Sequence, residues 1–261
     1  MQENVLSGLE GLDQKSLSRS GQAAIADAIR SIVNRHKRHE GEEWALTEVE
    51  LAPLEEMLGR FEPSDPVDRN LWLFDLMPEL PGKRDIDYEE RSKLTRSRRQ
   101  DALSEIFNTL GLAGVLRMVE GAKRPSDVGL ALADLELDAS AELEFLRVAL
   151  ACDPTRHEMP SLAQAVWEYA PAAYARGGMD WLHRISTDPE ISSKPSALVN
   201  LILALPPERA TWDIAQEWGD LVEKAYWERT TISVLRDEAT DSERAIKSLL
   251  DAGRPYRALQ V

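Results

Sequence analysis

The four histidines are the side chains that most readily ligate a transition metal, and two of them are close in sequence. His36 and His39 lie three residues apart, a spacing that places both on one face of a helix, near enough to share a zinc ion. Zinc needs further ligands, and the neighbouring Arg35, Lys37 and Arg38 carry positive charge that opposes a cation. We therefore expect a solvated helix end here and no metal site.

The single cysteine, Cys152, could act as a nucleophile if an imidazole activated it. His157 follows in the run Cys-Asp-Pro-Thr-Arg-His, and Asp153 could orient its ring. The thiol and the imidazole would have to reach hydrogen-bond contact, which the Asp-Pro turn would allow only in an uncommon geometry. We favour a small buried thiol at a helix end. Because there is no second cysteine, no intramolecular disulfide can form, which fits a reducing cytoplasm.

Asp85, Asp87, Glu89 and Glu90 form an acidic group that admits two interpretations. They could bind a divalent cation, or they could lie at the N-terminus of a helix, where negative charge complements the helix dipole. We favour the helix N-terminus. General acid–base catalysis would also need a partner acid at a defined distance, and the sequence defines none.

A concentrated basic run comes next, with no acidic residue from 91 to 100. On a helix, Lys93, Arg96 and Arg99 share one stripe, so they are the candidate phosphate-binding residues. The alternative is that this charge complements the acidic stretch 134–144 inside the folded protein. We favour the alternative and do not expect nucleic acid as a partner.

The chain holds seven tryptophans, five of them from Trp167 onward. Most should fill space between packed helices, because large aromatic side chains dominate core packing. Any that remain exposed would serve as anchors for a partner. Trp212, Trp218 and Trp227 are the candidate partner-binding residues, since acidic residues flank them.

Common catalytic and nucleotide-binding motifs are absent. The chain contains no Gly-x-x-x-x-Gly-Lys-Ser/Thr, Gly-x-Gly-x-x-Gly, His-Glu-x-x-His or Gly-x-Ser-x-Gly sequence. The sequence therefore predicts no catalytic residue and no cofactor, and we expect a protein that is not an enzyme. The alternative is an unrecognised enzymatic site, or an accessory role on nucleic acid.

The elements that must position these side chains are helices. Apolar residues recur at three- and four-residue spacing in 21–38, after Ser20 as a predicted N-cap, and in 52–61. Residues 63–87 hold four prolines around the apolar island Leu71–Phe74, which predicts a docked connector without long helices. We therefore divide the chain into an irregular N-terminal helical region (1–62), this connector (63–87) and a helical-repeat region (88–261).

Two observations predict αα-hairpin repeats in residues 88–261. Pro-Ser pairs at 125, 160 and 195 each open a helical run, and their 35-residue spacing is that of a two-helix repeat. The run Gly121-Ala-Lys-Arg-Pro125 is also echoed by Gly253-Arg-Pro255. An irregular helical bundle is the alternative. The strand-like run 230–235 is too isolated to predict a sheet, so the fold class is all-α.

These Pro-Ser starts and Gly-x-Arg-Pro-like turns resemble α-solenoids of the TPR and HEAT type, over about residues 88–261. The resemblance implies a protein-binding or scaffolding surface, although the Trp, Gly, Tyr and Pro pattern that marks a TPR is absent. The stretch from Trp72 to Pro81 also resembles helical segments of large multidomain bacterial proteins. The last residues, from Pro255 to Val261, look like a helix cut short, so the repeat region is possibly truncated there; we favour continuation over a capping helix.

Composition limits the partners. The net charge of −15 repels phosphates and anionic membranes, and 43% hydrophobic residues are typical of a folded protein. The N-terminus lacks a secretory signal, and no apolar stretch approaches the length of a membrane span. We expect a cytoplasmic, non-catalytic protein-interaction scaffold, or a helical-repeat module of a larger bacterial protein, whose partner is a protein.

Overall fold

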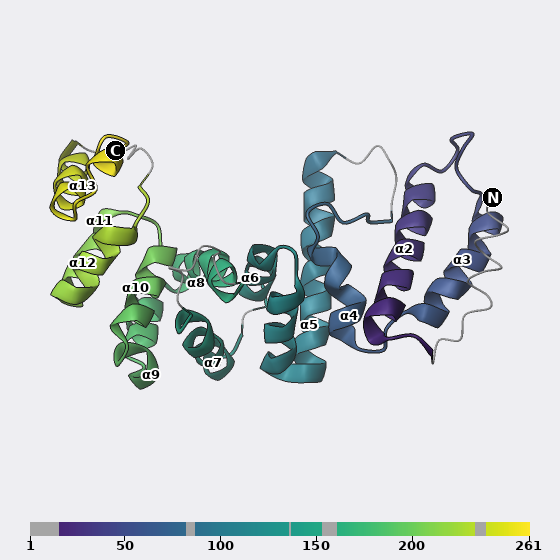
Figure 1. Ribbon diagram of the computed structural model, residues 1–261, viewed down its shortest axis with the longest axis horizontal. Helices are drawn as coiled ribbons and strands as arrows, with labels where there is room; N and C mark the ends of the chain where they lie inside the picture. The colour runs from purple at the N-terminus through teal and green to yellow at the C-terminus, as the bar shows by residue number, and fades with distance from the viewer. Residues whose placement is uncertain (1–15, 82–86, 136, 153–160, 233–238) are drawn as a thin grey trace. The chain divides into compact units, whose positions relative to one another are not determined.

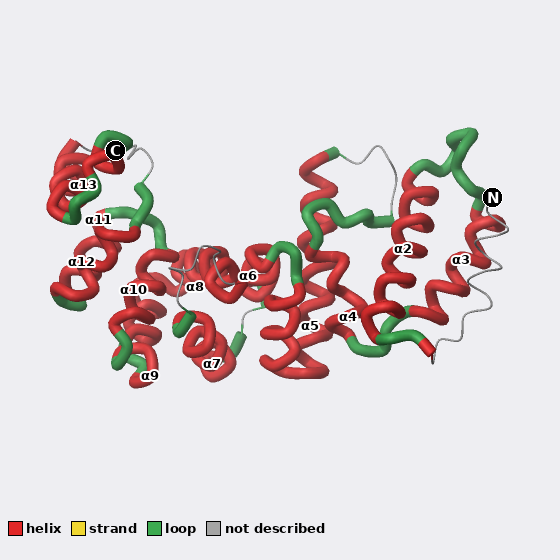
Figure 2. The backbone as a smooth tube through the Cα atoms, viewed as in Figure 1, coloured by secondary structure: helices red, strands yellow, loops and turns green. Residues whose placement is uncertain are grey.

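The computed structural model describes residues 16–81, 87–135, 137–152, 161–232 and 239–261, and every regular element in these ranges is a helix (Figures 1 and 2). The predicted all-α class is confirmed. The chain divides into two compact units, Met1–Arg124 (unit 1) and Pro125–Val261 (unit 2). The division falls at Arg124 and Pro125, outside the proline-rich segment 63–87 that the sequence favoured as a connector.

The first two helices described in unit 1, Arg19–Arg38 and Glu48–Phe61, pack against each other through their apolar faces. The helices of unit 1 are α2 (Arg19–Arg38), α3 (Glu48–Phe61), α4 (Pro66–Asn70), the 3₁₀ helix η2 (Leu71–Phe74) and α5 (Tyr88–Gly121). Buried side chains of α2, such as Ile29, pack against those of α3, such as Phe61. The N-cap of α2 is Ser18 and not Ser20, because the Gly21 N–H donates to Ser18 Oγ at 3.1 Å.

The proline-rich segment folds into α4 and η2 and belongs to unit 1. Asp65 caps α4 by accepting the N–H groups of Val67 and Asp68, and Pro66 occupies the first helical position. Leu73 and Phe74 of η2 are buried. The described part of the segment, 63–81, therefore contributes side chains to the core of unit 1.

Helix α5 starts where the acidic group predicts a helix N-terminus. The carboxylate of Asp87 accepts the Glu90 N–H at 2.8 Å, whereas Asp85 lies outside the described residues. Gly111, with φ +62°, breaks the helix. By length and composition α5 could cross a membrane, since one 18-residue window has a mean hydropathy of 1.3. Its side chains Leu103, Ile106 and Val115 lie in the core of unit 1.

Unit 2 continues the succession of helices. They are α6 (Pro125–Ala133), α7 (Ala139–Leu150), α8 (Ser161–Ser186), α9 (Pro189–Ser192), α10 (Pro195–Ala204), α11 (Arg209–Glu217), α12 (Asp220–Arg229), α13 (Ala239–Asp251) and α14 (Pro255–Ala258). Helices begin at Pro125 and Pro195 as predicted, whereas α8 is described from Ser161 onward and Pro160 lies outside the described residues. The Pro-Ser pairs are equally spaced, but the helices that follow them differ in length: α8 has 26 residues and α10 has 10.

The sequence echo is not repeated in the backbone. Gly253 takes φ +73°, and the Arg254 N–H returns to the Leu249 carbonyl at 2.8 Å. Gly121 remains helical as the last residue of α5. Of the strand-like run, Thr230 ends α12 and Ile232 is buried, and residues 233–235 lie outside the described ranges.

Helix α9 is anchored by an ion pair between Arg147 and Asp188. Asp188 is the N-cap of α9, and Arg147 Nε and Nη2 donate to its two carboxylate oxygens at 3.1 and 2.6 Å. The hydrogen bonds from Arg147 lower the pKa of Asp188 below its ordinary value. The charged form is therefore favoured more in the folded than in the unfolded chain.

We expect this ion pair to give unit 2 an acid-sensitive contribution to stability. Because the folded pKa is depressed, the contribution is complete above the unfolded pKa, about 3.9, and is lost as the pH falls through the folded value. Asp188→Asn keeps a capping side chain but removes the charge. Urea unfolding at a series of pH values should show the variant less stable at pH 7, with a gap to the wild type that narrows as the pH falls below about 3.9. The exposed Asp180→Asn is the control. A difference in the free energy of unfolding between Asp188→Asn and the wild type that stays constant with pH, and equals that of the control, would contradict the expected acid sensitivity.

Candidate functional site

The basic stripe predicted on α5 is divided between surface and interior. Lys93 is exposed and pairs with Glu89, and Arg96 is also exposed. Arg99 instead turns inward: Nε and Nη2 donate to the carbonyls of Leu73 and Asp75 at 2.7 and 3.1 Å, and its guanidinium lies over Phe74. Arg99 therefore caps the end of η2 and does not form a phosphate-binding stripe with the other two.

Two of the three tryptophans expected to bind a partner are core residues. Trp212 is fully buried and Trp227 is 4% exposed, with ring centroids 5.5 Å apart, while Trp218 is partly buried. The acidic neighbours Asp213 and Glu228 are exposed because adjacent helix positions point in different directions. Trp212 and Trp227 are thus corrected to core, where a partner cannot reach them.

Two tryptophans outside this predicted set are about half exposed. Trp44 is 51% exposed and Trp167 is 43% exposed, and no sequence signal distinguished either from the buried ones. Trp167 lines a shallow groove on unit 2 beside Asn200 and Arg229. Asn200 is committed to structure there, since its Nδ2 donates to the carbonyls of Leu150 and Cys152 at the end of α7.

The histidines and the cysteine of the sequence analysis have structural contacts. His36 Nδ1 accepts the Leu46 N–H at 3.0 Å, and the rings of His36 and His39 pack around Trp44. Within the described ranges no three His, Cys, Asp or Glu side chains are grouped to hold a metal. Cys152 is partly buried, and burial raises the pKa of its thiol; His157 lies outside the described residues.

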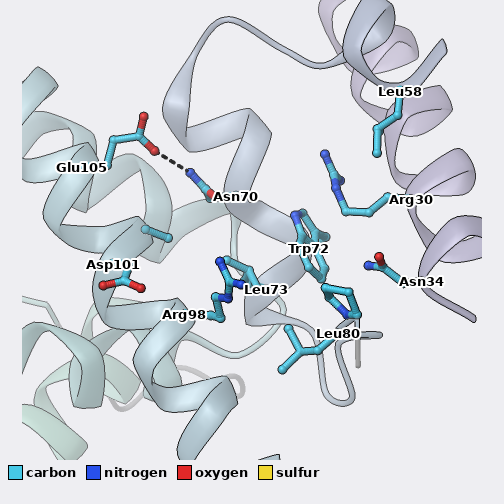
Figure 3. A pocket seen from close by; sticks show the side chains of 12 residues that line it. Arg30, Asn34, Leu58, Asn70, Trp72, Leu73, Leu80, Arg98, Asp101 and Glu105 are labelled. Atoms are coloured by element: carbon cyan, nitrogen blue, oxygen red, sulfur yellow. Dashed lines mark hydrogen bonds between the residues drawn. The ribbon is translucent and has the colours of Figure 1, made fainter. Parts of the chain in front are cut away.

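An opening among the described residues of unit 1 lies around Trp72, and we call it the indole cleft (Figure 3). Its volume is about 360 Å³, well above the 10–15 Å³ that one water molecule needs, roughly. Apolar walls come from Leu58, Trp72, Leu73, Leu80, Pro81 and Ala102. Polar groups reach it from α2 and α5: Arg30, Asn34, Arg98, Asp101 and Glu105, with Asn70 from α4.

Most of these polar groups are already paired. Arg30 is 6% exposed, forms ion pairs with Asp27 and Glu62, and lies 5.0 Å from the centroid of the Trp72 ring. Glu105 pairs with Arg69 and accepts from Asn70. Such groups hold the walls in place and have little capacity left for a ligand.

Three side chains retain binding capacity. Asn34 is 7% exposed, and its Nδ2 donates to the Glu79 carbonyl at 2.6 Å, which leaves Oδ1 without a partner among the described residues. Arg98 and Asp101 are exposed on α5 at the cleft (Figure 3), and neither forms a hydrogen bond or ion pair with another described residue. The cleft can thus offer one acceptor, one cation and one anion beside an aromatic wall.

A second opening adjoins the first across Trp72 and Arg30, and we call it the acidic cleft. Its volume is about 260 Å³. Three carboxylates line it, from Asp27, Asp75 and Glu79, together with Ser31, Met77, Pro78 and Lys123. Sequence reasoning missed both clefts, because their residues come from five separate stretches of unit 1.

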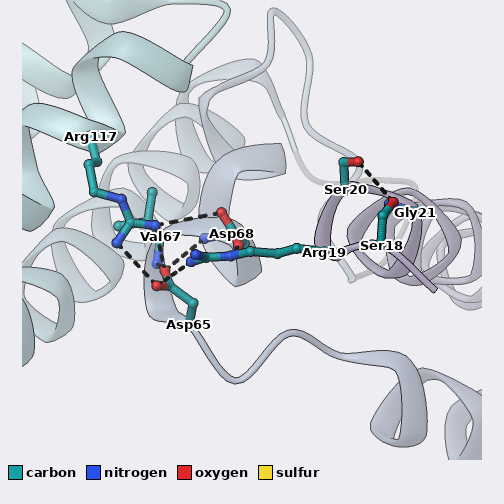
Figure 4. Close-up of polar contacts among 8 residues, drawn as sticks. All are labelled: Ser18, Arg19, Ser20, Gly21, Asp65, Val67, Asp68 and Arg117. Atoms are coloured by element: carbon teal, nitrogen blue, oxygen red, sulfur yellow. Dashed lines mark hydrogen bonds and ion pairs between the residues drawn. The ribbon is translucent and has the colours of Figure 1, made fainter. Parts of the chain in front are cut away.

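An ion-pair cluster fixes the helices that carry the clefts (Figure 4). Arg117 of α5 donates to both oxygens of Asp65 at 3.1 and 3.2 Å, and Arg19 of α2 pairs with Asp65 and Asp68. Burial alone would raise the pKa of Asp65, but hydrogen bonds from Arg117, the Val67 N–H and Arg19 lower it. Helix α4 is thereby tied to α2 and to α5, which places η2 and Trp72 between them.

Comparison with protein-family models, curated proteins and solved structures finds no match to this chain. The functional argument therefore depends on the residues and the geometry of the clefts.

Proposed function

We propose that this chain is a non-catalytic protein-interaction scaffold, acting in the cytoplasm, and that the indole cleft of unit 1 receives a segment of the partner. The observation that carries the proposal is the unused acceptor of Asn34, which is nine-tenths buried in a cleft with an aromatic wall. The Oδ1 atom keeps contact with solvent, and the N–H of an extended polypeptide is a common donor that can replace water there.

The remaining groups of the cleft suit the same ligand. Its charged lining is balanced, with Arg30 and Arg98 against Asp101 and Glu105, so a neutral side chain can enter without an uncompensated charge. Trp72 and Leu80 offer apolar surface to that side chain. Arg98 and Asp101 can pair with charged residues at the rim of the contact, where they contribute to specificity.

We also propose that the helices form an αα-hairpin array of the α-solenoid kind. Support comes from a local pattern that occurs twice in the chain, at Gly111 and at Gly178. The two glycines are 67 residues apart, about twice the length of a two-helix repeat. Gly111 and Gly178 both break a helix at positive φ, 62° and 56°, with ψ −156° and −144°. Each is followed at the same offsets by a buried aliphatic residue, an arginine and a second buried aliphatic residue: Val115, Arg117 and Met118; Leu182, Arg184 and Ile185.

Selection from a random peptide library displayed on phage, with the whole chain as bait, tests the binding proposal. We expect enriched peptides that bind the wild type and bind Arg98→Glu or Asp101→Lys about tenfold more weakly, a loss of roughly 1.4 kcal/mol. Both positions are exposed, so the fold should survive the changes.

Arg91→Glu is the matched control, because Arg91 is on the same helix and does not line the cleft. Its affinity for the enriched peptides should equal that of the wild type in fluorescence polarisation. Failure to enrich any peptide, or equal binding by all four proteins, would contradict the proposal.

A further inference from the structure

We propose that His36 is a pH-sensitive latch on the connection between α2 and α3: the neutral imidazole holds residues 40–46 in place, and its protonation releases them. The connection runs from the end of α2 at Arg38 to the N-cap of α3 at Thr47. His36 lines neither of the two clefts around Trp72. The inference therefore goes beyond the proposed scaffold function and does not depend on it.

One hydrogen bond ties the connection back to α2. The main-chain N–H of Leu46 donates to His36 Nδ1 at 3.0 Å, across ten residues of chain. A ring nitrogen accepts only when it carries no proton, so this bond requires the neutral imidazole with its proton on Nε2. In the imidazolium both ring nitrogens are donors, and the Nδ1–H would face the Leu46 N–H. The bond and the charged ring therefore exclude each other.

Leu46 stands at a position where this bond controls how α3 begins. It directly precedes the N-cap Thr47, and its side chain packs against the apolar cluster between α2 and α3. Leu51, four residues after the cap, belongs to the same cluster. Apolar residues at these two positions are the elements of a hydrophobic staple, which fixes the direction in which the chain enters a helix. Loss of the Leu46 bond would loosen this entry.

Trp44 makes the state of the latch observable and brings in a second imidazole. Its ring contacts the rings of His36 and His39, with centroids 5.5 and 4.9 Å away. His39 Nδ1 is buried and forms no hydrogen bond within the described part of the chain, so a proton added there has no acceptor among these residues. A charged imidazole can attract the face of the indole, but it cannot accept the Leu46 N–H. Release of Leu46 should therefore also change the surroundings of Trp44.

The charged groups around His36 influence the pH at which it gains a proton, but they cannot replace its acceptor. Cations of α2 oppose a proton, and carboxylates of the connection favour it. Lys37 pairs with Glu55 of α3, and Glu50 is engaged by the N-cap Thr47. Glutamates ordinarily titrate near pH 4, at about 4.3, so a transition above about pH 5 belongs to an imidazole. The charged groups on the surrounding elements are Arg35, Lys37 and Arg38 on α2, Glu40, Glu42 and Glu43 in the connection, Glu48, Glu50 and Glu55 on α3, and Glu79 in the segment that contacts Ser31 and Asn34.

Nuclear magnetic resonance of the whole chain tests the inference at three groups. The nitrogen shifts of the His36 ring report its tautomer, and we expect Nε2–H at about pH 7.5. Amide exchange at Leu46 reports the bond, when it is expressed as a protection factor that removes the intrinsic pH dependence of exchange. From about pH 7.5 to about pH 5 this protection should fall about tenfold, as expected for the loss of one hydrogen bond. The indole N–H signal of Trp44, assigned by its loss in Trp44→Phe, should shift over the same range.

Substitution of His36 separates the latch from other effects of acid. The side chain introduced by His36→Asn does not titrate, and its carboxamide oxygen can take the place of Nδ1 as acceptor. Whether or not it forms the bond, the pH dependence at Leu46 and Trp44 should disappear. His183→Asn is the matched control, because His183 is exposed on α8 in unit 2, and it should behave as the wild type. An Nδ1–H tautomer at the higher pH, equal protection of Leu46 at both pH values, or a decrease that persists in His36→Asn would overturn the inference.

Discussion

Gly129→Ala is expected to destabilise unit 2 by about 3 kcal/mol, at the upper end of what overpacking usually costs. Gly129 lies in α6 at its contact with α8, where a Cβ would be 2.0 Å from the Ala165 carbonyl oxygen and 2.7 Å from its carbon. These are backbone atoms within a helix, so no side-chain rotation can relieve the overlap. The two helices would have to separate, and the buried side chains along their contact would lose packing.

The measurement is urea unfolding followed by far-ultraviolet circular dichroism, with Gly59→Ala as the matched control. Gly59 is also inside a helix, but a Cβ there would meet no atom within 4 Å. The control should be neutral or more stable by about 0.5–1 kcal/mol, because alanine restricts the unfolded chain and favours helix. Equal stability of the two alanine variants would show that α6 and α8 are not in close contact at Gly129.

Glu142→Ala is expected to destabilise unit 2 by about 3–4 kcal/mol, because it leaves several buried donors without an acceptor. Glu142 is 5% exposed, and its Oε1 accepts the Tyr169 hydroxyl at 2.7 Å and the Trp181 Nε1–H at 2.8 Å. Its other oxygen pairs with Arg184. Burial, and then the hydrogen bond to Glu142, raise the pKa of Tyr169, so the hydroxyl stays protonated and donates.

Glu144→Ala is the control, since Glu144 is exposed on the same helix, and we expect a change within about 0.5 kcal/mol. A double-mutant cycle with Tyr169→Phe then isolates the hydrogen bond. Because Phe removes one of the stranded donors, the losses of the two single variants should add to more than the loss of the double variant. Strict additivity, or a small effect of Glu142→Ala, would mean that the carboxylate is not shared among these donors.

Several features of the fold could be predicted from the sequence because they depend on neighbours along the chain. Asp87 caps α5 and proline begins α6 and α10 through contacts within one helical turn. The all-α class follows from apolar spacing, which is also a local pattern. The prediction that Ser20 caps α2 was wrong by two residues, since Ser18 offers the same hydroxyl to the same helix end.

Other features depend on which helix faces meet, and no local pattern contains that information. Trp212 and Trp167 are similar in sequence context, yet α11 turns one into the core and α8 leaves the other at the surface. The sequence places Arg99 in a stripe of basic residues. In the structure its guanidinium instead donates to the carbonyls of Leu73 and Asp75, at the end of η2. In the sequence, Glu142 does not differ from the acidic residues expected at the surface. In the structure it is buried in unit 2 and accepts from three side chains of α8, those of Tyr169, Trp181 and Arg184.

The clefts around Trp72 show the same limit. The sequence predicted a docked apolar island at Leu71–Phe74, because prolines prevent long helices there. It gave no sign that Asn34, Arg98 and Glu79 would surround the indole, since they lie on separate stretches of the chain. Caps and helix starts are set by bonds between adjacent residues, whereas a binding surface forms only when packing brings distant residues together and leaves some of their polar atoms without partners.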